Sequence, residues 1–248
     1  MSLPIAEIRK KIFFNSGLIV VGRFLGTISS LLIIPMNIHK LGIDGYGQWG
    51  AIWAEATFFS VFNMALASTM LWQSSTVEEE GVSPDEYTQV IRHRAGIGVF
   101  FVLIQFLLCG IVVLLLQDLL TTKIGLTASP LNRLCLVGSI GLVLLSGYNE
   151  IVGSILSGQH FSGVVSNMRN ISALLGNLIT FILLVAGWGL ISLPLGFAGN
   201  YLLFFLMLVL WSGRKLGIIF FMPRIPGWSE LKLLTGYTVC GLIGRITA

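Results

Sequence analysis

The chain has 248 residues, of which 55% are hydrophobic and only 10% are charged, and its formal net charge is +4. Its mean hydropathy of +0.89 lies far outside the range of soluble domains, which excludes a water-soluble enzyme or binding module. The basic residues fall in loops between apolar segments, where they encode orientation in a membrane rather than a nucleic-acid footprint. The composition therefore predicts an all-α polytopic membrane protein.

Six apolar segments are each long enough to cross a bilayer, which takes about 20 residues. In chain order they cover residues 12–38, 49–72, 96–116, 132–157, 164–187 and 190–212, and a seventh begins near Gly236. The first contains Arg23 and has no small-residue cleavage motif, so it is predicted to be a spanning helix and not a signal peptide. The predicted domains are a six-helix transmembrane lobe at 1–212, a cytoplasmic interfacial connector at 213–235 and the truncated start of a second lobe at 236–248.

The distribution of Lys and Arg predicts the orientation of the lobe. Ten of these residues, Arg169 among them, are assigned to the N-terminus and the even-numbered loops, against three in the alternate loops. The positive-inside rule therefore predicts a cytoplasmic N-terminus. Tyr46, Trp49 and Trp53 are predicted to form an aromatic belt at the outer end of the second segment.

Polar residues inside the apolar segments are the candidate functional residues, because such residues in a membrane face a cavity or one another. Those predicted to face a common water-filled cavity are Arg23, Glu55, Asn63, Glu150, Asn170 and Asn177. Arg23 and Glu150 lie at similar depths, so an ion pair between them is one expectation. For the uncharged residues, hydrogen bonds between packed helices are the alternative. The three cysteines show no metal or disulfide spacing, and neither a metal nor a cofactor is predicted.

Two stretches resemble a known family. The run Leu41–Gly42, Tyr46–Gly47 and Trp49 is similar to the LGxxxYGxW signature of the polysaccharide-export flippases, the Wzx-like branch of the multidrug/oligosaccharidyl-lipid/polysaccharide exporter superfamily. The stretch from Ile155 to Phe161, with Asn170 and the run 174–177, resembles the region of that family between its fourth and fifth spans. The resemblance implies a protein of the bacterial inner membrane that moves lipid-linked oligosaccharide to the outer leaflet for O-antigen, capsule or exopolysaccharide.

The family has twelve or more spans in two lobes, so the resemblance implies that this chain is the amino-terminal lobe of a longer protein. The carboxy-terminal lobe, membrane lipids and other polysaccharide assembly proteins are then the expected partners. Asn63 stands where many members carry an aspartate, which removes a carboxylate from any cation site at that position.

A short internal sequence repeat adds a second candidate arginine. The stretch 16–24 reads SGLIVVGRF and 238–246 reads TVCGLIGRI, so Gly22–Arg23 recurs as Gly244–Arg245. An even number of segments separates the two copies, which predicts parallel repeats about an axis along the membrane normal. Arg23 and Arg245 are therefore predicted to grip a diphosphate from opposite walls of one cavity.

Three other functions stay open. A cation-coupled drug antiporter of the same superfamily needs acidic groups in the cavity, and Glu55 and Glu150 supply candidates. A membrane glycan polymerase or glycosyltransferase needs a sizeable loop with catalytic carboxylates or histidines, and the outer loops are short. A non-transporting scaffold requires that the polar stripes pack against one another.

Overall fold

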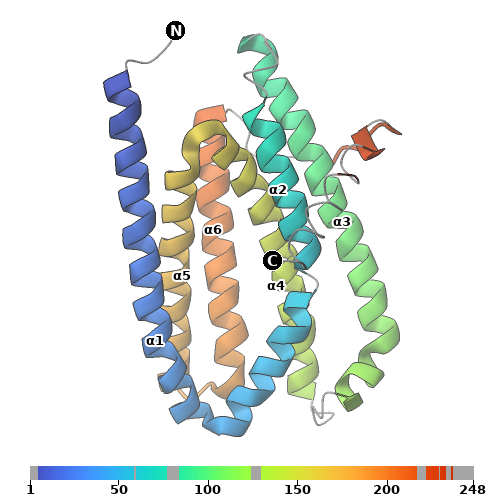
Figure 1. Cartoon of the computed structure of the whole chain (residues 1–248). Helices are drawn as coiled ribbons and strands as arrows, with labels where there is room; N and C mark the ends of the chain where they lie inside the picture. The colour runs from blue at the N-terminus through green and yellow to red at the C-terminus, as the bar shows by residue number, and fades with distance from the viewer. Residues whose placement is uncertain are drawn as a thin grey trace.

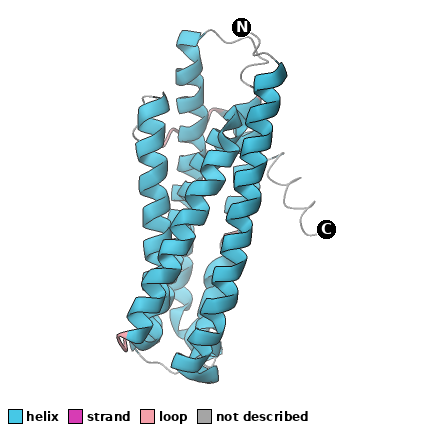
Figure 2. Ribbon diagram, turned by 90° about the vertical axis from the view of Figure 1, so that its left-hand side faces the viewer, coloured by secondary structure: helices cyan, strands magenta, loops and turns pink. Residues whose placement is uncertain are grey.

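The computed structural model describes residues 5–58, 60–76, 84–123, 130–216, 222–228, 230–232 and 236. All regular structure in these residues is helical, and the long helices stand side by side as an elongated bundle (Figures 1 and 2). The helices are α1 (Ile5–Phe58), α2 (Val61–Ser75), α3 (Pro84–Lys123), α4 (Pro130–Leu156), α5 (Ser162–Val185) and α6 (Ser192–Leu216), with a π-helix, η1 (Ser157–Phe161), and a 3₁₀-helix, η2 (Gly189–Ile191).

Helix α1 contains a reversal of the chain at Gly42, whose φ of 73° and ψ of 166° are not helical. A side chain at such a φ is strained, which accounts for a glycine at this position. Figure 1 shows α1 descending to this point and then rising toward α2. The predicted span 49–72 is not one unbroken helix, since α1 ends at Phe58 and α2 begins at Val61. At this break the hydroxyls of Thr57 and Ser60 donate to the backbone carbonyls of Trp53 and Thr57.

A second reversal joins α4 to α5 through η1. Gln159 and His160 are non-helical within it, and His160 has a φ of 65°, in the left-handed region. Only five residues therefore turn the chain from α4 into α5, and Figure 1 shows the two helices on either side of this turn.

Four segments of the described residues are long and apolar enough to span a membrane: Ile19–Ala54, Glu86–Leu108, Leu134–Val185 and Gly189–Arg214. The first contains the Gly42 reversal and the third contains η1. The structure thus supports an all-helical, multi-pass membrane protein, and the count of six crossings stays a prediction.

The predicted aromatic belt is wrong for Trp49, which is only 5% exposed. Its ring stacks on Trp53 at 5.6 Å between centroids, and Trp53 lies 4.2 Å from the ring of Phe197 in α6. Stacking inside the bundle buries more ring area than an outward position offers, so these aromatic residues join two helices.

Helices α5 and α6 pack closely through small residues. A Cβ added to Gly176 would lie 2.8 Å from the carbonyl oxygen of Gly196, and one added to Gly196 would overlap the hydroxyl of Thr180. In lipid, where apolar burial between helices gains little, such close backbone contact is a principal source of helix association. The glycines at this crossing therefore fix the position of α5 against α6.

We expect Gly176→Ala to lower the free energy of unfolding by about 1–3 kcal/mol, because the added methyl group meets backbone atoms that cannot give way. Gly141→Ala in α4 is the matched control, since nothing lies within 4 Å of its added Cβ. Thermal unfolding in detergent, followed by circular dichroism, measures both. Equal stability of the two variants would contradict the close α5–α6 contact.

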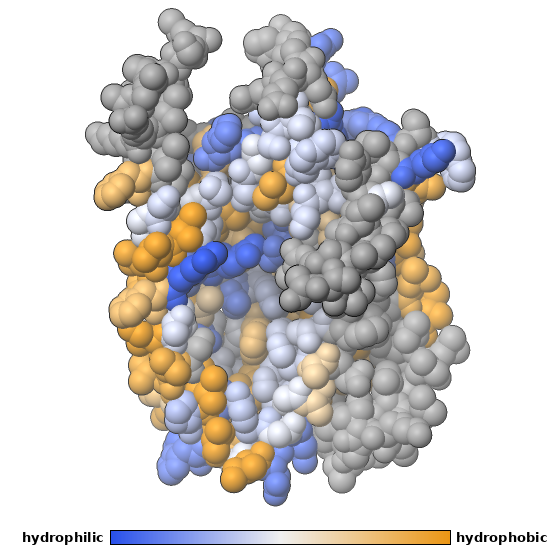
Figure 3. Space-filling model, viewed as in Figure 1, coloured by the Kyte–Doolittle hydropathy of each residue, from blue (hydrophilic) through white to orange (hydrophobic). Residues whose placement is uncertain are grey.

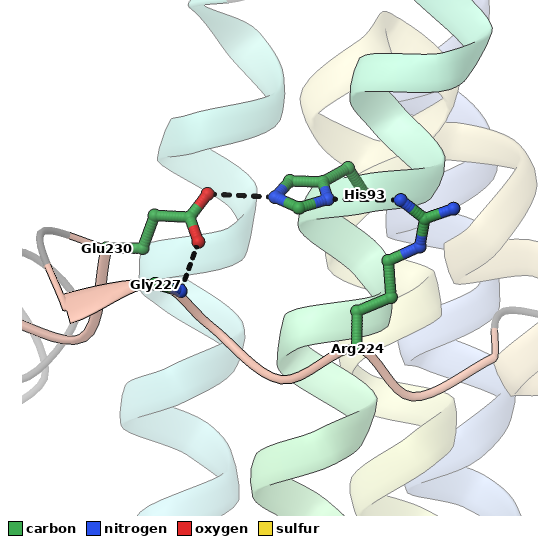
Figure 4. A network of polar contacts seen from close by, with 4 residues as sticks. All are labelled: His93, Arg224, Gly227 and Glu230. Atoms are coloured by element: carbon green, nitrogen blue, oxygen red, sulfur yellow. Dashed lines mark hydrogen bonds and ion pairs between the residues drawn. The ribbon is translucent and has the colours of Figure 1, made fainter.

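The segment after α6 is tied to α3 by polar contacts. We call its described residues, 222–228 and 230–232, the strap. The Arg224 amide donates to the carbonyl oxygen of Gly96 at 2.9 Å. His93 Nε2 lies 2.8 Å from Glu230 Oε1, and the Arg224 guanidinium lies 3.3 Å from His93 Nδ1 (Figure 4). A guanidinium only donates, so Nδ1 of His93 accepts and Nε2–H donates to Glu230.

The Glu230 carboxylate makes this attachment dependent on pH. Burial raises the pKa of Glu230, but hydrogen bonds from the Gly227 amide and His93 and the charge of Arg94 outweigh it and hold this pKa below its ordinary value. A lowered carboxyl pKa means that the attached state is favoured above the ordinary pKa and loses this advantage as the pH falls through the lowered value.

Acidification through that range should therefore loosen the strap. Nitroxide labels at Gln89 and Lys232 report the separation of α3 and the strap by electron paramagnetic resonance, and their distance distribution should broaden at low pH. In a Glu230→Gln background the distance distribution should no longer broaden over the pH range in which the carboxyl group titrates. An identical pH response in both proteins would show that another group controls the attachment.

Candidate functional site

The first half of α1 has a polar stripe between a buried and an apolar one, at about 100° per residue. Gly22 and Ser29 lie on the stripe that contacts α5. Ser16, Arg23 and Thr27 share the next stripe, and all three are exposed. The stripe beyond is exposed and apolar, and it includes Val20, Phe24 and Leu31. Arg23 therefore lies on a polar edge that borders the α1–α5 contact.

Two asparagines of α5 contact α1 along this border. Asn177 donates from Nδ2 to the hydroxyl of Ser29 at 2.6 Å. One α-helical heptad earlier, a Cβ added to Gly22 would overlap the amide of Asn170. The same sequence offset in both contacts shows that α1 and α5 run parallel, as Figure 1 shows. Among the described residues the Nδ2 of Asn170 has no hydrogen-bond partner, so a buried donor lies next to Gly22.

Glu150 of α4 is paired with Arg169 of α5, whose Nη2 lies 2.8 Å from Glu150 Oε2. The guanidinium also lies 5.5 Å from the ring centroid of Phe204 in α6, within cation–π range. The expectation of a Glu150–Arg23 pair is thus wrong. The physical reason is the short turn at η1. Residues 150 and 169 each lie nine residues from its non-helical pair, Gln159 and His160, and such symmetric residues face each other in an antiparallel helix pair.

Arg169 was assigned to a loop, and this assignment is also wrong because it lies two turns inside α5. The predicted span 164–187 includes position 169, so the sequence already indicated that Arg169 belongs to a helix. Moving it leaves nine basic residues against three, so the predicted orientation is unchanged.

Helix α6 completes this polar cluster. Asn149 of α4 donates to the backbone carbonyl of Tyr201 at 3.0 Å, and Tyr201 lies within electrostatic range of Glu150 and Arg169. The sequence offered no signal for Tyr201, because nothing in its local pattern distinguishes it from other aromatic residues of an apolar span.

Asn63 occupies a different environment from the α1–α5 asparagines. It is 1% exposed and contacts Gly147 of α4, whose added Cβ would lie 2.6 Å from the Asn63 amide nitrogen. Within the described part of the chain neither atom of its amide has a hydrogen-bond partner. The side chain of Glu55 and the whole of Arg245 lie outside the described residues.

Figure 3 shows that one face of the bundle is hollowed in the middle and that a band of hydrophilic atoms crosses it from the α1 side. Apolar atoms form the left margin of the same face.

In the described residues no group of three His, Cys, Asp or Glu side chains is placed to hold a metal ion. The arrangement provides an uneven polar surface with two guanidinium groups, one carboxylate and several amides.

No family model matches this chain, and no curated protein matches it. A crystal structure of MATE in complex with MaD3S matches with a TM-score of 0.65, over 96% of this chain and 53% of that one. This chain folds like about half of a MATE protein. The sequence identity is 16%, so the likeness to MATE shows the fold alone.

The pairing of Glu150 predicts the result of two double-mutant cycles. Glu150→Gln and Arg169→Gln should show a coupling free energy of about 0.5–3 kcal/mol, near the lower end because both side chains are partly exposed. The control cycle combines Glu150→Gln with Arg23→Gln, and its effects should add to within about 0.5 kcal/mol. Unfolding in detergent measures both cycles. Stronger coupling to Arg23 than to Arg169 would show that the ion pair is assigned to the wrong arginine.

Proposed function

We propose that this chain is the amino-terminal lobe of a transporter that flips polyprenyl-diphosphate-linked oligosaccharide across the bacterial inner membrane for surface polysaccharide biosynthesis. The MATE-like fold supports a membrane transporter of the multidrug/oligosaccharidyl-lipid/polysaccharide exporter superfamily. The family motifs around Gly42 and Gly158 support the polysaccharide branch. In this proposal the lobe crosses the membrane six times with its N-terminus in the cytoplasm.

The observation that carries the substrate class is the charge of the polar face. Glu150 is neutralised by Arg169, whereas Arg23 is exposed and forms no ion pair with the described residues. The described face therefore has a net positive charge beside the amide of Asn170. A positive, amide-rich surface suits an anionic diphosphate and its hydroxyl-rich sugars better than it suits a cation.

In the two-lobe protein, Arg245 supplies the second half of a headgroup clamp. Parallel repeats carry it to the wall opposite Arg23, and each guanidinium binds phosphate oxygens through paired N–H donors. A lysine carries the same charge but lacks this planar fork. The clamp thus depends on arginine itself at both positions.

A cation-coupled antiporter is the second candidate, and the MATE-like fold is the observation that favours it. Such a transporter needs an acidic group that binds a proton or a cation. Glu150 serves this role only if it leaves Arg169, and Glu55 is the other candidate. The polar face of the described residues is therefore less suited to a cation than to an anion.

The clamp predicts that Arg23→Lys and Arg245→Lys each reduce glycan export in the full-length protein, with a loss of roughly tenfold or more in the double variant. Export is measured as surface polysaccharide in cells that depend on the variant, and membrane accumulation is measured in parallel. Glu150→Gln is the control and should have a milder effect on export.

Uptake of a cationic dye into cells separates the two candidates. Normal surface polysaccharide in the double arginine variant would exclude the clamp. Efflux of the dye that depends on Glu55 or Glu150 and not on Arg23 would favour the antiporter.

A further inference from the structure

The strap has an exposed apolar edge. Pro223 and Pro226 fix their own φ near −65° and hold Met222 and Ile225, which precede them, in extended conformations. A chain of this kind approaches the polyproline II helix, with three residues per turn. Trp228 follows at the start of a helical turn, in which the Leu231 amide donates to the Gly227 carbonyl. Met222, Ile225 and Trp228 are 74%, 80% and 80% exposed and make up the apolar edge of the strap.

The other side of the strap is attached to α3. The Arg224 amide bonds to the Gly96 carbonyl, and a Cβ added to Gly96 would lie 2.6 Å from the carbonyl oxygen of Met222. Glu230 accepts from the Gly227 amide at 2.8 Å and from His93, so the polar groups of the strap are satisfied on the α3 side. The three apolar side chains are left uncovered by the described part of the protein.

The attachment point lies at the polar end of an apolar helix. Arg92, His93 and Arg94 come just before Gly96, and an uninterrupted apolar run follows from Ile97 to Ile104. Further along, α3 exposes apolar side chains such as Leu103 and Leu107. This change from charged to apolar residues marks the depth at which lipid headgroups meet acyl chains.

We propose that the strap is a membrane-surface anchor whose edge of Met222, Ile225 and Trp228 inserts into the headgroup–acyl boundary of the bilayer beside α3. Tryptophan is enriched at this depth because its ring is apolar and its N–H is polar. The exposed cations Arg92, Arg224 and Lys232 surround the edge and are attracted to anionic headgroups. The apolar edge of the strap continues the exposed apolar face of α3. This continuity favours lipid over a soluble partner as the group that covers the edge. The inference rests on the membrane location and not on the transported substrate.

A fluorescent label measures the depth of the edge in the full-length protein. In a background where Cys109, Cys135 and Cys240 are replaced by alanine, single cysteines at Ile225 and at Trp228 are labelled with NBD, and the protein is reconstituted into vesicles of phosphatidylcholine and phosphatidylglycerol. A lipid with a nitroxide near its glycerol backbone serves as the quencher. We expect blue-shifted emission at both positions and quenching at least about twofold stronger than at Gln89, an exposed position nearer the start of α3.

Two results would overturn the anchor. Emission at 225 and 228 equal to that at Gln89 would place the edge in water. Blue-shifted emission without lipid quenching would show that protein covers the edge, either another part of the chain or a second copy. Neither result depends on transport. The anchor can therefore be confirmed when the glycan-export proposal is excluded, and it can be excluded when that proposal is confirmed.

Discussion

The close contact of α5 with both of its neighbours is the constraint on which the rest of the structure depends. Gly176 and Gly196 bring the backbones of α5 and α6 together, and Gly22 makes room for Asn170 where α5 meets α1. Apolar side chains gain little from packing on one another in lipid, so small residues and interhelical hydrogen bonds supply the association energy. Helix α5 has close glycine contacts on both sides, and on the α1 side it adds the hydrogen bond from Asn177 to Ser29.

The same close packing decides where polar groups go. Asn177 bonds to Ser29, Asn149 bonds to the carbonyl of Tyr201, and the guanidinium of Arg94 bonds to the carbonyl oxygen of Gln73 near the end of α2. Each bond satisfies a group that would otherwise be costly to place in a low-dielectric bundle. Arg23 of α1 differs from these three groups, because it lies on an exposed stripe and not against a partner helix.

Length and hydropathy were enough to predict an all-helical membrane fold, because spanning segments are defined by composition. The predictions that were wrong concern features that tertiary contacts determine. The break before α2 has no counterpart in the hydropathy pattern, and the burial of Trp49 comes from Phe197, which is distant in sequence. The partner of Glu150 depends on where the chain turns between α4 and α5. Once η1 is known, residues 150 and 169 follow by symmetry, but hydropathy alone does not locate a five-residue turn.

The Glu150–Arg169 pair sets different conditions for anions and for cations under the proposed function. An anion at the polar face binds Arg23, whose charge is uncompensated by the described residues, without displacing Glu150 from Arg169. A cation finds its carboxylate already bound at 2.8 Å and must first displace a guanidinium that also lies over the ring of Phe204. Both side chains are partly exposed, so this displacement costs about as much as breaking a surface ion pair, on the order of 1 kcal/mol or less. The pairing within the lobe therefore works against a cation even though the face contains a carboxylate.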